Sequence, residues 1–330
     1  MAKCMTDTIN LTSVADAIRT KGGTSAQLIY PSGFVSAIQA IQTGITPKLV
    51  VTTTPGAAIT ATPAEGFKVV KGTAGADGMC TLELPKAGTW HVTAMANSVS
   101  NSQNIVIGTQ NMLLPLYHDT FANNTWEEII TVCRTGIAPD SWAVGDSKTM
   151  NIGGTAYQVD IIGKNHDEYA DGSGTAPLTF QLHDCYSEAK QMYSTNLSGL
   201  GWKNTDMRLT YLPAILALMP AEVKNGIHAV NKKTSEGGNS TTIETVSDTL
   251  FLLSEAEIFG TASSSVAGEG SQYDYYKAGN PKIKKREGVD EFWWERSSAS
   301  GGMFCRVRAN GQAGASNASS SLGVSFAFCF

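Results

Sequence analysis

The sequence has few charged side chains for its 330 residues. Charged residues make up 16% of the chain and the formal net charge is −5, whereas 33 residues are glycine. A charge-driven disordered protein needs more charge and less hydrophobic content, so the composition excludes that class. The negative net charge argues against nucleic acid as the main partner, because phosphate repels it. A chain of this length usually holds two or three domains, each with its own core.

Long apolar runs are also missing. The chain contains no stretch of about 18 apolar residues, so we expect no membrane insertion. Residues Met1 to Asp7 lack the apolar segment of a secretory signal peptide. If the protein acts outside the cell, we therefore expect it to leave by lysis or inside a larger particle.

The cysteines are scattered and show no C-x-x-C spacing. This pattern supports neither a disulfide scaffold nor a zinc site, and buried thiols that pack as small hydrophobic groups are the expected alternative. The six positions are Cys4, Cys80, Cys133, Cys185, Cys305 and Cys329.

Catalytic and cofactor motifs are lacking as well, and we expect neither an enzyme nor a bound cofactor or metal. There is no G-x-S-x-G, no Walker loop and no G-x-G-x-x-G after a strand. Asn165-His166-Asp167 and His183-Asp184 could form a metal site, but without H-E-x-x-H-like spacing polar caps at strand ends are favoured. The basic cluster at Lys282 to Arg286 is followed by acidic residues, which favours a solvated loop over a nucleic-acid patch.

Residues 1–45 predict a short helical hairpin. In its first helix, which begins at Ser13, Val14, Ala17 and Ile18 would share one face, and Gly22-Gly23 would end the helix. A second helix is expected from Phe34 to about Gly44. Two helices of about ten residues cannot form a core. We therefore expect this segment to dock on another structure, with a frayed end as the alternative.

Over residues 46–109 apolar and polar residues alternate with a period of two. This alternation predicts a small immunoglobulin-like β-sandwich. Turn signals such as Pro55-Gly56 and Asp77-Gly78 separate the strands. Trp90 would face the core and His91 the solvent. The expected strands span 49–53, 57–62, 67–72, 80–84, 89–95 and 104–107.

Residues 110–330 predict one larger α+β domain, with helices early and strands late. Thr125 to Glu128 forms a capping box for a helix that ends at Gly136, and Gly153-Gly154 predicts a hairpin. Helices are expected at 187–192 and 205–212, with an interruption at Pro213. A buried strand is expected at 248–253, followed by a short turn at 255–259.

The last segment combines a small-residue tract with aromatic flanks. From Ser297 to Gly323, 19 of 27 residues are Ser, Ala, Gly or Asn. Such a tract is typical of a flexible linker. However, Phe292 to Arg296 precede it, and Val324 to Phe330 alternate large apolar residues after it. These flanks predict core strands that hold small polar residues on display, which suits a binding surface on a rigid scaffold.

Seven segments carry a family resemblance: Trp142 to Asp146, Tyr157 to Asp167, Trp202 to Arg208, Leu218 to Lys224, Asp248 to Glu257, Gln272 to Tyr276 and Trp293 to Ser297. Through them, residues from about 126 to 330 resemble the C-type-lectin-like domain of many phage and prophage proteins of gut bacteria. The tail resembles the variable region of proteins diversified by retroelements, in which a reverse transcriptase mutates adenines of a copied template. The usual ending there is Gly-Val-Arg-Pro-Ala-Phe, and Gly323 to Phe328 departs from it at two positions. Residues 12–44 resemble a helical segment of phage tail and baseplate proteins.

This resemblance implies a phage or prophage tail adhesin, located in the virion tail, that binds a host-surface receptor. The receptor would be a host cell-surface protein or glycan. Other tail or baseplate proteins would bind the N-terminal segment, and the homotrimer common among tail proteins is the assembly that the resemblance implies. The variable region would span about 297–325. By the pattern of that region, the exposed ligand-binding set is Ser298, Ser300, Gly301, Gly302, Met303, Arg306, Arg308, Gln312, Ala313, Ala315, Ser316, Ser319 and Leu322.

Two alternatives remain at this stage. One is a structural decoration protein of a phage particle that uses the same domain without diversification. The other is an enzyme, because the lectin-like fold also hosts a formylglycine-generating activity that depends on a reactive cysteine pair, for which Cys305 and Cys329 are the late candidates. Calcium-dependent sugar binding is not supported, because Glu-Pro-Asn, Gln-Pro-Asp and Trp-Asn-Asp do not occur.

Overall fold

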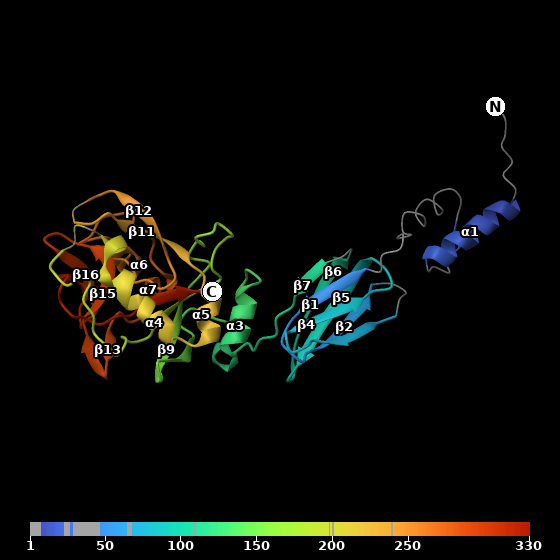
Figure 1. Ribbon diagram of the computed structural model, residues 1–330, viewed down its shortest axis with the longest axis horizontal. Helices are drawn as coiled ribbons and strands as arrows, with labels where there is room; N and C mark the ends of the chain where they lie inside the picture. Colours follow the sequence, from blue (N-terminus) through green and yellow to red (C-terminus); the bar gives the residue numbers. More distant parts are fainter. Residues whose placement is uncertain are drawn as a thin grey trace, which may run out of the picture. The chain divides into compact units, whose positions relative to one another are not determined.

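The chain is a β-rich multidomain protein with few helices (Figure 1). The computed structural model describes residues 8–22, 27–28, 47–64, 68–107, 110–197, 199, 201–238 and 240–330. It divides into two compact units, Met1–Leu116 and Tyr117–Phe330. None of the helices in these ranges is long and apolar enough to cross a membrane.

The first described element is helix α1, Thr8–Gly22. It overlaps the first predicted helix, but it begins at Thr8 rather than Ser13, and its buried face also differs. Ala15 and Ile18 are buried, whereas Val14 and Ala17 are exposed. Positions 15 and 18 are three residues apart and so lie on one face of a helix. The second predicted helix, from Phe34 to about Gly44, lies outside the described residues.

The strands of the first unit form two sheets that share one core. One sheet has the order β4-β1-β7 and the other β3-β2-β5-β6, with β1 and β7 as the parallel pair. Trp90 is buried and His91 is exposed, as the alternation predicted. The strands are β1 Lys48–Thr52, β2 Ala58–Pro63, β3 Val70–Thr73, β4 Met79–Glu83, β5 Gly88–Ala96, β6 Val99–Ile107 and β7 Gln110–Leu113.

Two boundaries in this unit differ from the prediction. β6 begins at Val99 rather than Asn104, because Asn97 and Ser98 both have positive φ and form a two-residue hairpin turn after β5. β7 was not predicted, and its pairing with β1 extends the first unit to residue 116 rather than 109.

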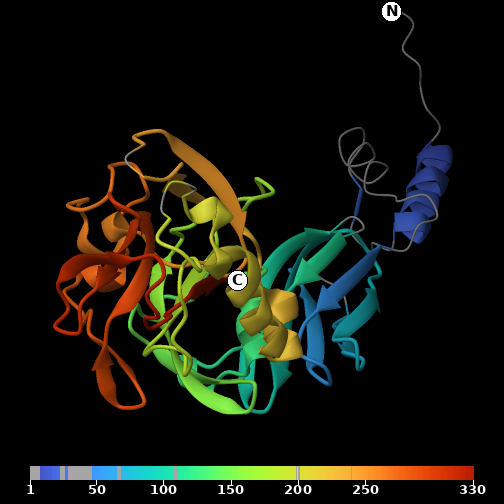
Figure 2. The same cartoon turned by 60° about the vertical axis from the view of Figure 1, so that its left-hand side comes forward.

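The second unit is built on a four-stranded antiparallel sheet with the order β18-β10-β9-β8. Its strands are β8 Ser147–Ile152, β9 Thr155–Lys164, β10 Leu178–Leu182 and β18 Ala327–Cys329. The Gly153-Gly154 hairpin and the Thr125–Glu128 capping box of helix α3, Trp126–Cys133, are confirmed. The indole of Trp126 contacts the rings of Phe180 and Phe330, so both ends of this unit meet on one core. Figures 1 and 2 show the C-terminus beside α3.

The remaining elements of this unit surround that sheet. They are η1 Phe121–Asn123, η2 Trp202–Asn204, the π-helical turn η3 Met207–Tyr211, α4 Leu212–Leu218, α5 Ala221–Gly226, β11 Val230–Ser235, β12 Ile243–Asp248, α6 Glu255–Phe259, α7 Asp274–Lys277, β13 Lys284–Arg286, β14 Val289–Glu291, β15 Trp293–Ser298, β16 Met303–Val307 and β17 Ala313–Asn317. Strands β11-β12, β13-β14 and β15-β16-β17 form three small antiparallel sheets.

Three local predictions for this unit were wrong. Residues 187–192 form no helix, and 248–253 form no strand beyond the end of β12 and an isolated bridge at Phe251. Pro213 does not interrupt the segment after Leu212. It lies in the first turn of α4, where the missing N–H of proline costs nothing. The short turn at 255–259 is helix α6.

Candidate functional site

The small-residue tract is folded as the sheet β15-β16-β17, which we call the tail sheet. Trp294 pairs with Arg306, Phe304 with Ser316, and Val307 with Ala313. The register of the β15–β16 pair shifts between Trp294 and Ser298. The tract is therefore an antiparallel sheet with one irregularity rather than a linker.

Large buried side chains of β15 and β16 anchor the tail sheet to the core. Trp293, Trp294, Phe304 and Val307 are fully buried. The indole N–H of Trp293 donates to the Lys282 carbonyl at 2.9 Å, and that of Trp294 donates to the Lys190 carbonyl at 2.8 Å. Burying these large side chains stabilises the sheet, and pairing each indole N–H avoids the cost of an unmade hydrogen bond.

The predicted ligand-binding residues do not share one degree of exposure. Ser300, Gly301, Arg308 and Gln312 are exposed, and Ser298 is buried. The expectation that Ser298 is displayed is therefore wrong, because the whole of β15 lies inside the unit. The partly exposed members are Gly302, Met303, Arg306, Ala313, Ala315, Ser316, Ser319 and Leu322.

Three of these residues have structural tasks. A Cβ on Gly302 would lie 2.5 Å from the Asn196 carbonyl oxygen, and the φ of Gly302 is +76°, so the position requires glycine. Ser319 donates its hydroxyl to Asn196 at 2.5 Å. Leu322 exchanges two backbone hydrogen bonds with Lys190.

The two arginines of the tract are held differently. Arg306 donates from Nε to the Ala315 carbonyl at 3.2 Å, and its guanidinium lies 4.2 Å from the centre of the Phe292 ring. Burial, followed by the charge of Arg308, lowers the pKa of Arg306. Arg308 is exposed and lies over Gly314, where an added Cβ would come within 2.8 Å of its Nε. Arg308 is thus the more accessible cation.

Acidic side chains gather around β15, the inner strand of the tail sheet. Glu295 of this strand is fully buried, and neither of its carboxyl oxygens has a hydrogen-bond partner among the described residues. Burial and the neighbouring Glu255 and Glu269 raise its pKa well above the usual range, against the opposing charge of Arg306. Arg306 Nη1 is also buried without a hydrogen-bond partner. Glu255 differs, because Ser263, Ser264 and Ser265 donate backbone and hydroxyl hydrogen bonds to its carboxylate.

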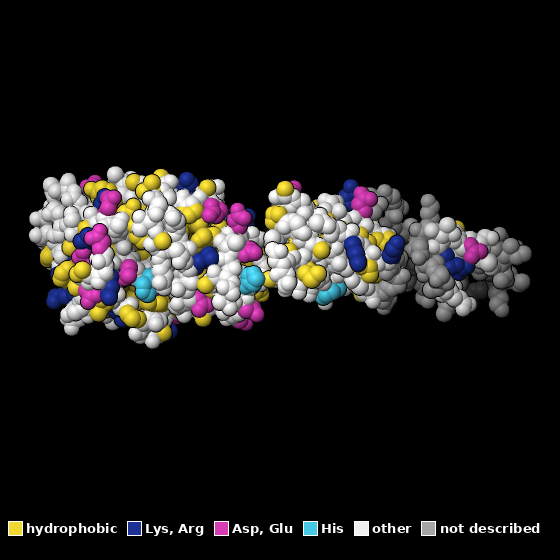
Figure 3. All heavy atoms as spheres, turned by 90° about the horizontal axis from the view of Figure 1, so that it is seen from below, with side chains coloured by type: hydrophobic (Ala, Val, Ile, Leu, Met, Phe, Trp, Pro, Cys, Tyr) yellow, Lys and Arg dark blue, Asp and Glu magenta, His cyan; other side chains and the backbone are white. Residues whose placement is uncertain are grey.

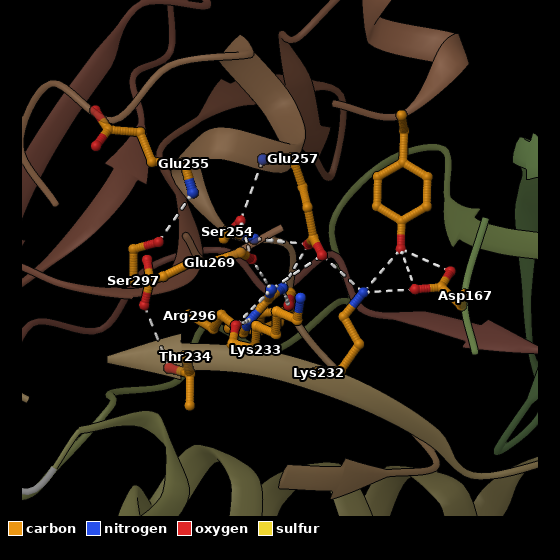
Figure 4. Close-up of polar contacts among 12 residues, drawn as sticks. Asp167, Lys232, Lys233, Thr234, Ser254, Glu255, Glu257, Glu269, Arg296 and Ser297 are labelled. Carbon is orange, nitrogen blue, oxygen red and sulfur yellow. Dashed lines mark hydrogen bonds and ion pairs between the residues drawn. The ribbon is translucent and has the colours of Figure 1, made fainter. Parts of the chain in front are cut away.

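A second buried network ties β15 to the rest of the unit (Figure 4). Arg296 forms an ion pair with Glu257 of α6 and donates to the carbonyls of Leu252 at 3.0 Å, Lys233 at 2.9 Å and Glu269 at 2.5 Å. These partners lie on three separate segments, so Arg296 locks the inner strand of the tail sheet in place.

Lys232 and Asp167 continue this network. Lys232 Nζ lies 2.7 Å from Asp167 Oδ1 and 2.7 Å from Glu257 Oε1. Burial alone would raise the pKa of Asp167, but the charge and hydrogen bond of Lys232, with a hydrogen bond from Thr179, lower it to about 2. Burial opposes the charge of Lys232, yet Asp167 and Glu257 hold its pKa above the usual value.

The histidine and aspartate motifs form paired polar groups. His166 stacks on Tyr273, with ring centres 3.9 Å apart, and His183 Nδ1 lies 2.7 Å from Asp160. Hydrogen bonding to Asp160 raises the pKa of His183 despite partial burial. Within the described ranges, no three His, Cys, Asp or Glu side chains are grouped so as to hold a metal ion.

The cysteines in the described part of the chain are buried and unpaired. Burial raises the pKa of Cys305 and Cys329 well above the usual range. A reactive cysteine has the opposite features, namely an accessible thiol with a lowered pKa. Cys4 lies outside the described residues.

Sequence reasoning predicted the aromatic anchors and missed the buried ionic groups. Glu295 and Arg296 directly follow two tryptophans. Alternation along a strand places every second residue outward, so it does not predict that both residues are buried. Their position directly after two core tryptophans is the signal that could have indicated burial.

Comparison with known proteins adds one finding. Residues 179–330 match a family described as a domain of unknown function (DUF6273). This range contains β18, the whole tail sheet and all of β10 except Leu178, but less than half of the chain. Searches of curated proteins and of solved structures gave no match.

Proposed function

We propose that the chain is a phage or prophage tail adhesin that binds a host-surface receptor with the outer face of the tail sheet. In this proposal, residues 117–330 form a C-type-lectin-like domain and the first unit is an immunoglobulin-like spacer. The helical N-terminal segment would attach the chain to other tail or baseplate proteins.

The observation that carries the proposal is the order of the small-residue tract. The small side chains of the tract lie between the aromatic flanks Phe292 to Arg296 and Val324 to Phe330. They leave a shallow surface on which residues can change without disturbing the core. The contact between Trp126 of α3 and Phe330 also supports the proposal. It brings the two ends of the second unit together, so the loops on the opposite side of the unit are left to contact a ligand. Ser298 and Gly302 leave the candidate set, since one is buried and the other must be glycine.

Arg308 is the residue we assign the leading role in recognition. Its exposed guanidinium can form two parallel, charge-assisted hydrogen bonds with a carboxylate, sulfate or phosphate group. Arg306 would contribute mainly by holding Phe292 and β17 in place. A weak single site is strengthened by many copies on one particle.

We expect Arg308→Ala to lower the amount of protein captured by envelopes of candidate gut-bacterial hosts by about tenfold. This corresponds to the loss of roughly one charge-assisted hydrogen-bonded contact. Arg134→Ala, an exposed arginine at the end of α3, is the matched control and should bind as the wild type does. If envelopes that bind the wild type captured all three proteins equally, the role assigned to Arg308 would be contradicted.

Diversification is a separate part of the proposal and has its own test. It requires a near-copy of the codons for residues 297–323 beside a reverse-transcriptase gene. Where the neighbouring DNA holds no such copy, the tail sheet is a receptor-binding surface of constant sequence.

A further inference from the structure

Lys232 is a buried lysine in contact with two carboxylates and a phenol. Its side chain is 3% exposed, and Nζ lies 2.7 Å from Asp167, 2.7 Å from Glu257 and 3.0 Å from the Tyr273 hydroxyl. Figure 4 shows Asp167 and Glu257 approaching this nitrogen from separate segments. The amine and the Asp167 carboxyl carbon are therefore held within reach of each other.

Two aromatic rings cover this contact within the buried ionic network. The ring centres of Phe251 and Tyr273 lie 4.3 Å and 5.4 Å from Nζ, and both carboxylates are almost fully buried. Condensation requires transfer of one proton along the Lys232–Asp167 hydrogen bond to give a neutral amine and a neutral acid. Because the pKa of Asp167 is lowered to about 2 and that of Lys232 is raised, this neutral pair is the minor species from which the reaction proceeds.

The carboxyl group of Asp167 is also polarised for attack. The hydroxyls of Thr179 and Tyr273 donate to Oδ2 at 2.6 Å and 2.8 Å. Donors in these positions stabilise the negative charge that builds on a carbonyl oxygen when a nucleophile adds to its carbon, as an oxyanion hole does.

We propose that Lys232 and Asp167 condense to an intramolecular isopeptide bond. The lone pair of the neutral amine attacks Cγ of Asp167, a C–N bond forms, and the bond from Cγ to Oδ1 breaks. Two protons leave Nζ in all and end on Oδ1, which departs as water, while the amide retains one N–H. No oxidant, reductant or other reactant is needed.

Glu257 and Tyr273 are placed to move these protons. Glu257 Oε1 accepts a hydrogen bond from Nζ, and Arg296 pairs with the same carboxylate and so keeps it ionised and oriented. Tyr273 accepts a hydrogen bond from Nζ, and its hydroxyl, which carries a single proton, lies 2.8 Å from Oδ2 and 3.0 Å from Oδ1, measured from the donor oxygen. It can therefore stabilise Oδ2 during attack and then turn to Oδ1 as that oxygen leaves, but it cannot do both at once.

The bond would link β11 to the segment after β9 across 65 residues of sequence. It would lie in the same network that holds β15 and the tail sheet. This inference concerns a modification within the fold and stands whether or not the chain is an adhesin.

Intact mass of the full chain, measured after denaturation, tests the proposal. We expect a mass about 18 Da below the value calculated from the sequence, equal to one water. Proteolysis should give a branched peptide that joins the segments around Asp167 and Lys232. A full calculated mass, with the two segments recovered as separate peptides, would overturn the proposal without recourse to any variant.

Variants then assign the roles. Lys232→Arg should restore the full mass, and Glu257→Gln should reduce the fraction of linked chain at least tenfold if Glu257 accepts the proton. Lys233→Arg is the matched control, because Lys233 is the adjacent, exposed lysine of β11, and it should keep the 18 Da deficit. A deficit that persists in Lys232→Arg would show that the bond lies elsewhere.

Discussion

At the scale of single residues, two neighbouring charges on β15 have opposite surroundings. Arg296 is fully buried, but a carboxylate and three carbonyls satisfy its guanidinium. Glu295 is equally buried, and within the described part of the chain both of its oxygens lack a hydrogen-bond partner. Burial of an unpaired charge is costly, so the protonated form of Glu295 is favoured in the folded state.

This difference predicts a pH-dependent cost at Glu295. Because its folded pKa is raised above the usual value of 4.5, its contribution to stability is greatest below about pH 4.5 and is lost as the pH rises toward the folded pKa. Glu295→Gln cannot ionise and should be more stable than the wild type at pH 7 to 8, by roughly 1–3 kcal/mol, with no advantage near pH 4. Urea unfolding across this pH range measures the effect.

Glu287→Gln is the control for this comparison, because Glu287 is an exposed carboxylate of the β13-β14 turn. Its unfolding free energy should follow the wild-type pH profile. If Glu295→Gln also ran parallel to the wild type at every pH, Glu295 would not be an unpaired buried acid.

Residue-level prediction from sequence succeeded where side-chain chemistry and burial agree. Trp90 and Trp293 were placed in the core because large aromatics gain most from burial. The burial of Arg296 was missed, because its compensating partner Glu257 is 39 positions away and only the folded chain brings them together. Charged residues are rarely buried unless paired, so sequence alone favours exposure.

At the scale of elements, the turn between β15 and β16 determines how the tail sheet folds. Gly301 and Gly302 both have positive φ, but an added Cβ would meet only the end of Met303 at position 301 and the backbone of Asn196 at position 302. The two glycines therefore differ in packing while sharing the same backbone constraint.

Gly302→Ala should accordingly destabilise the protein more than Gly301→Ala. We expect about 1 kcal/mol for Gly301→Ala from the left-handed backbone alone. For Gly302→Ala we expect roughly 2–4 kcal/mol, because the Asn196 segment must also move. Thermal unfolding of both variants measures the difference, and equal losses would show that the Asn196 contact is unimportant.

Element prediction was reliable for segments with capping or turn chemistry and poor for segments held by long-range contacts. The capping box of α3 and the Gly153-Gly154 hairpin carry their own local hydrogen bonds and backbone preferences. The apolar segment 248–253 resembles a strand, but β12 ends at Asp248, and Phe251 forms only a bridge to Ala327. An apolar run indicates burial and does not determine hydrogen-bond pairing.

At the scale of the whole molecule, the limit between the two units depends on one short strand. Sequence placed it after residue 109, but β7 lies beside β1 and contributes Met112 to the core of the first unit. The parallel pairing joins segments about 60 residues apart, which local patterns cannot reveal.

Truncation tests this boundary. A fragment of residues 1–116 should unfold cooperatively in urea, whereas a fragment of residues 1–109 should be less stable by about 2–4 kcal/mol. The shorter fragment loses the burial of Met112, Leu114 and Leu116 and exposes the edge of β1. Identical midpoints for the two fragments would place the boundary at residue 109 after all.

The separation of anchors from displayed positions in the tail sheet has a practical consequence for combinatorial libraries. Randomised codons at the exposed positions 300, 308 and 312 would sample new chemistry above an unchanged core, while codons for Gly302, Phe304 and Val307 are best kept constant. A library restricted in this way would waste few members on misfolded chains and would make the unit a usable scaffold for engineered binders.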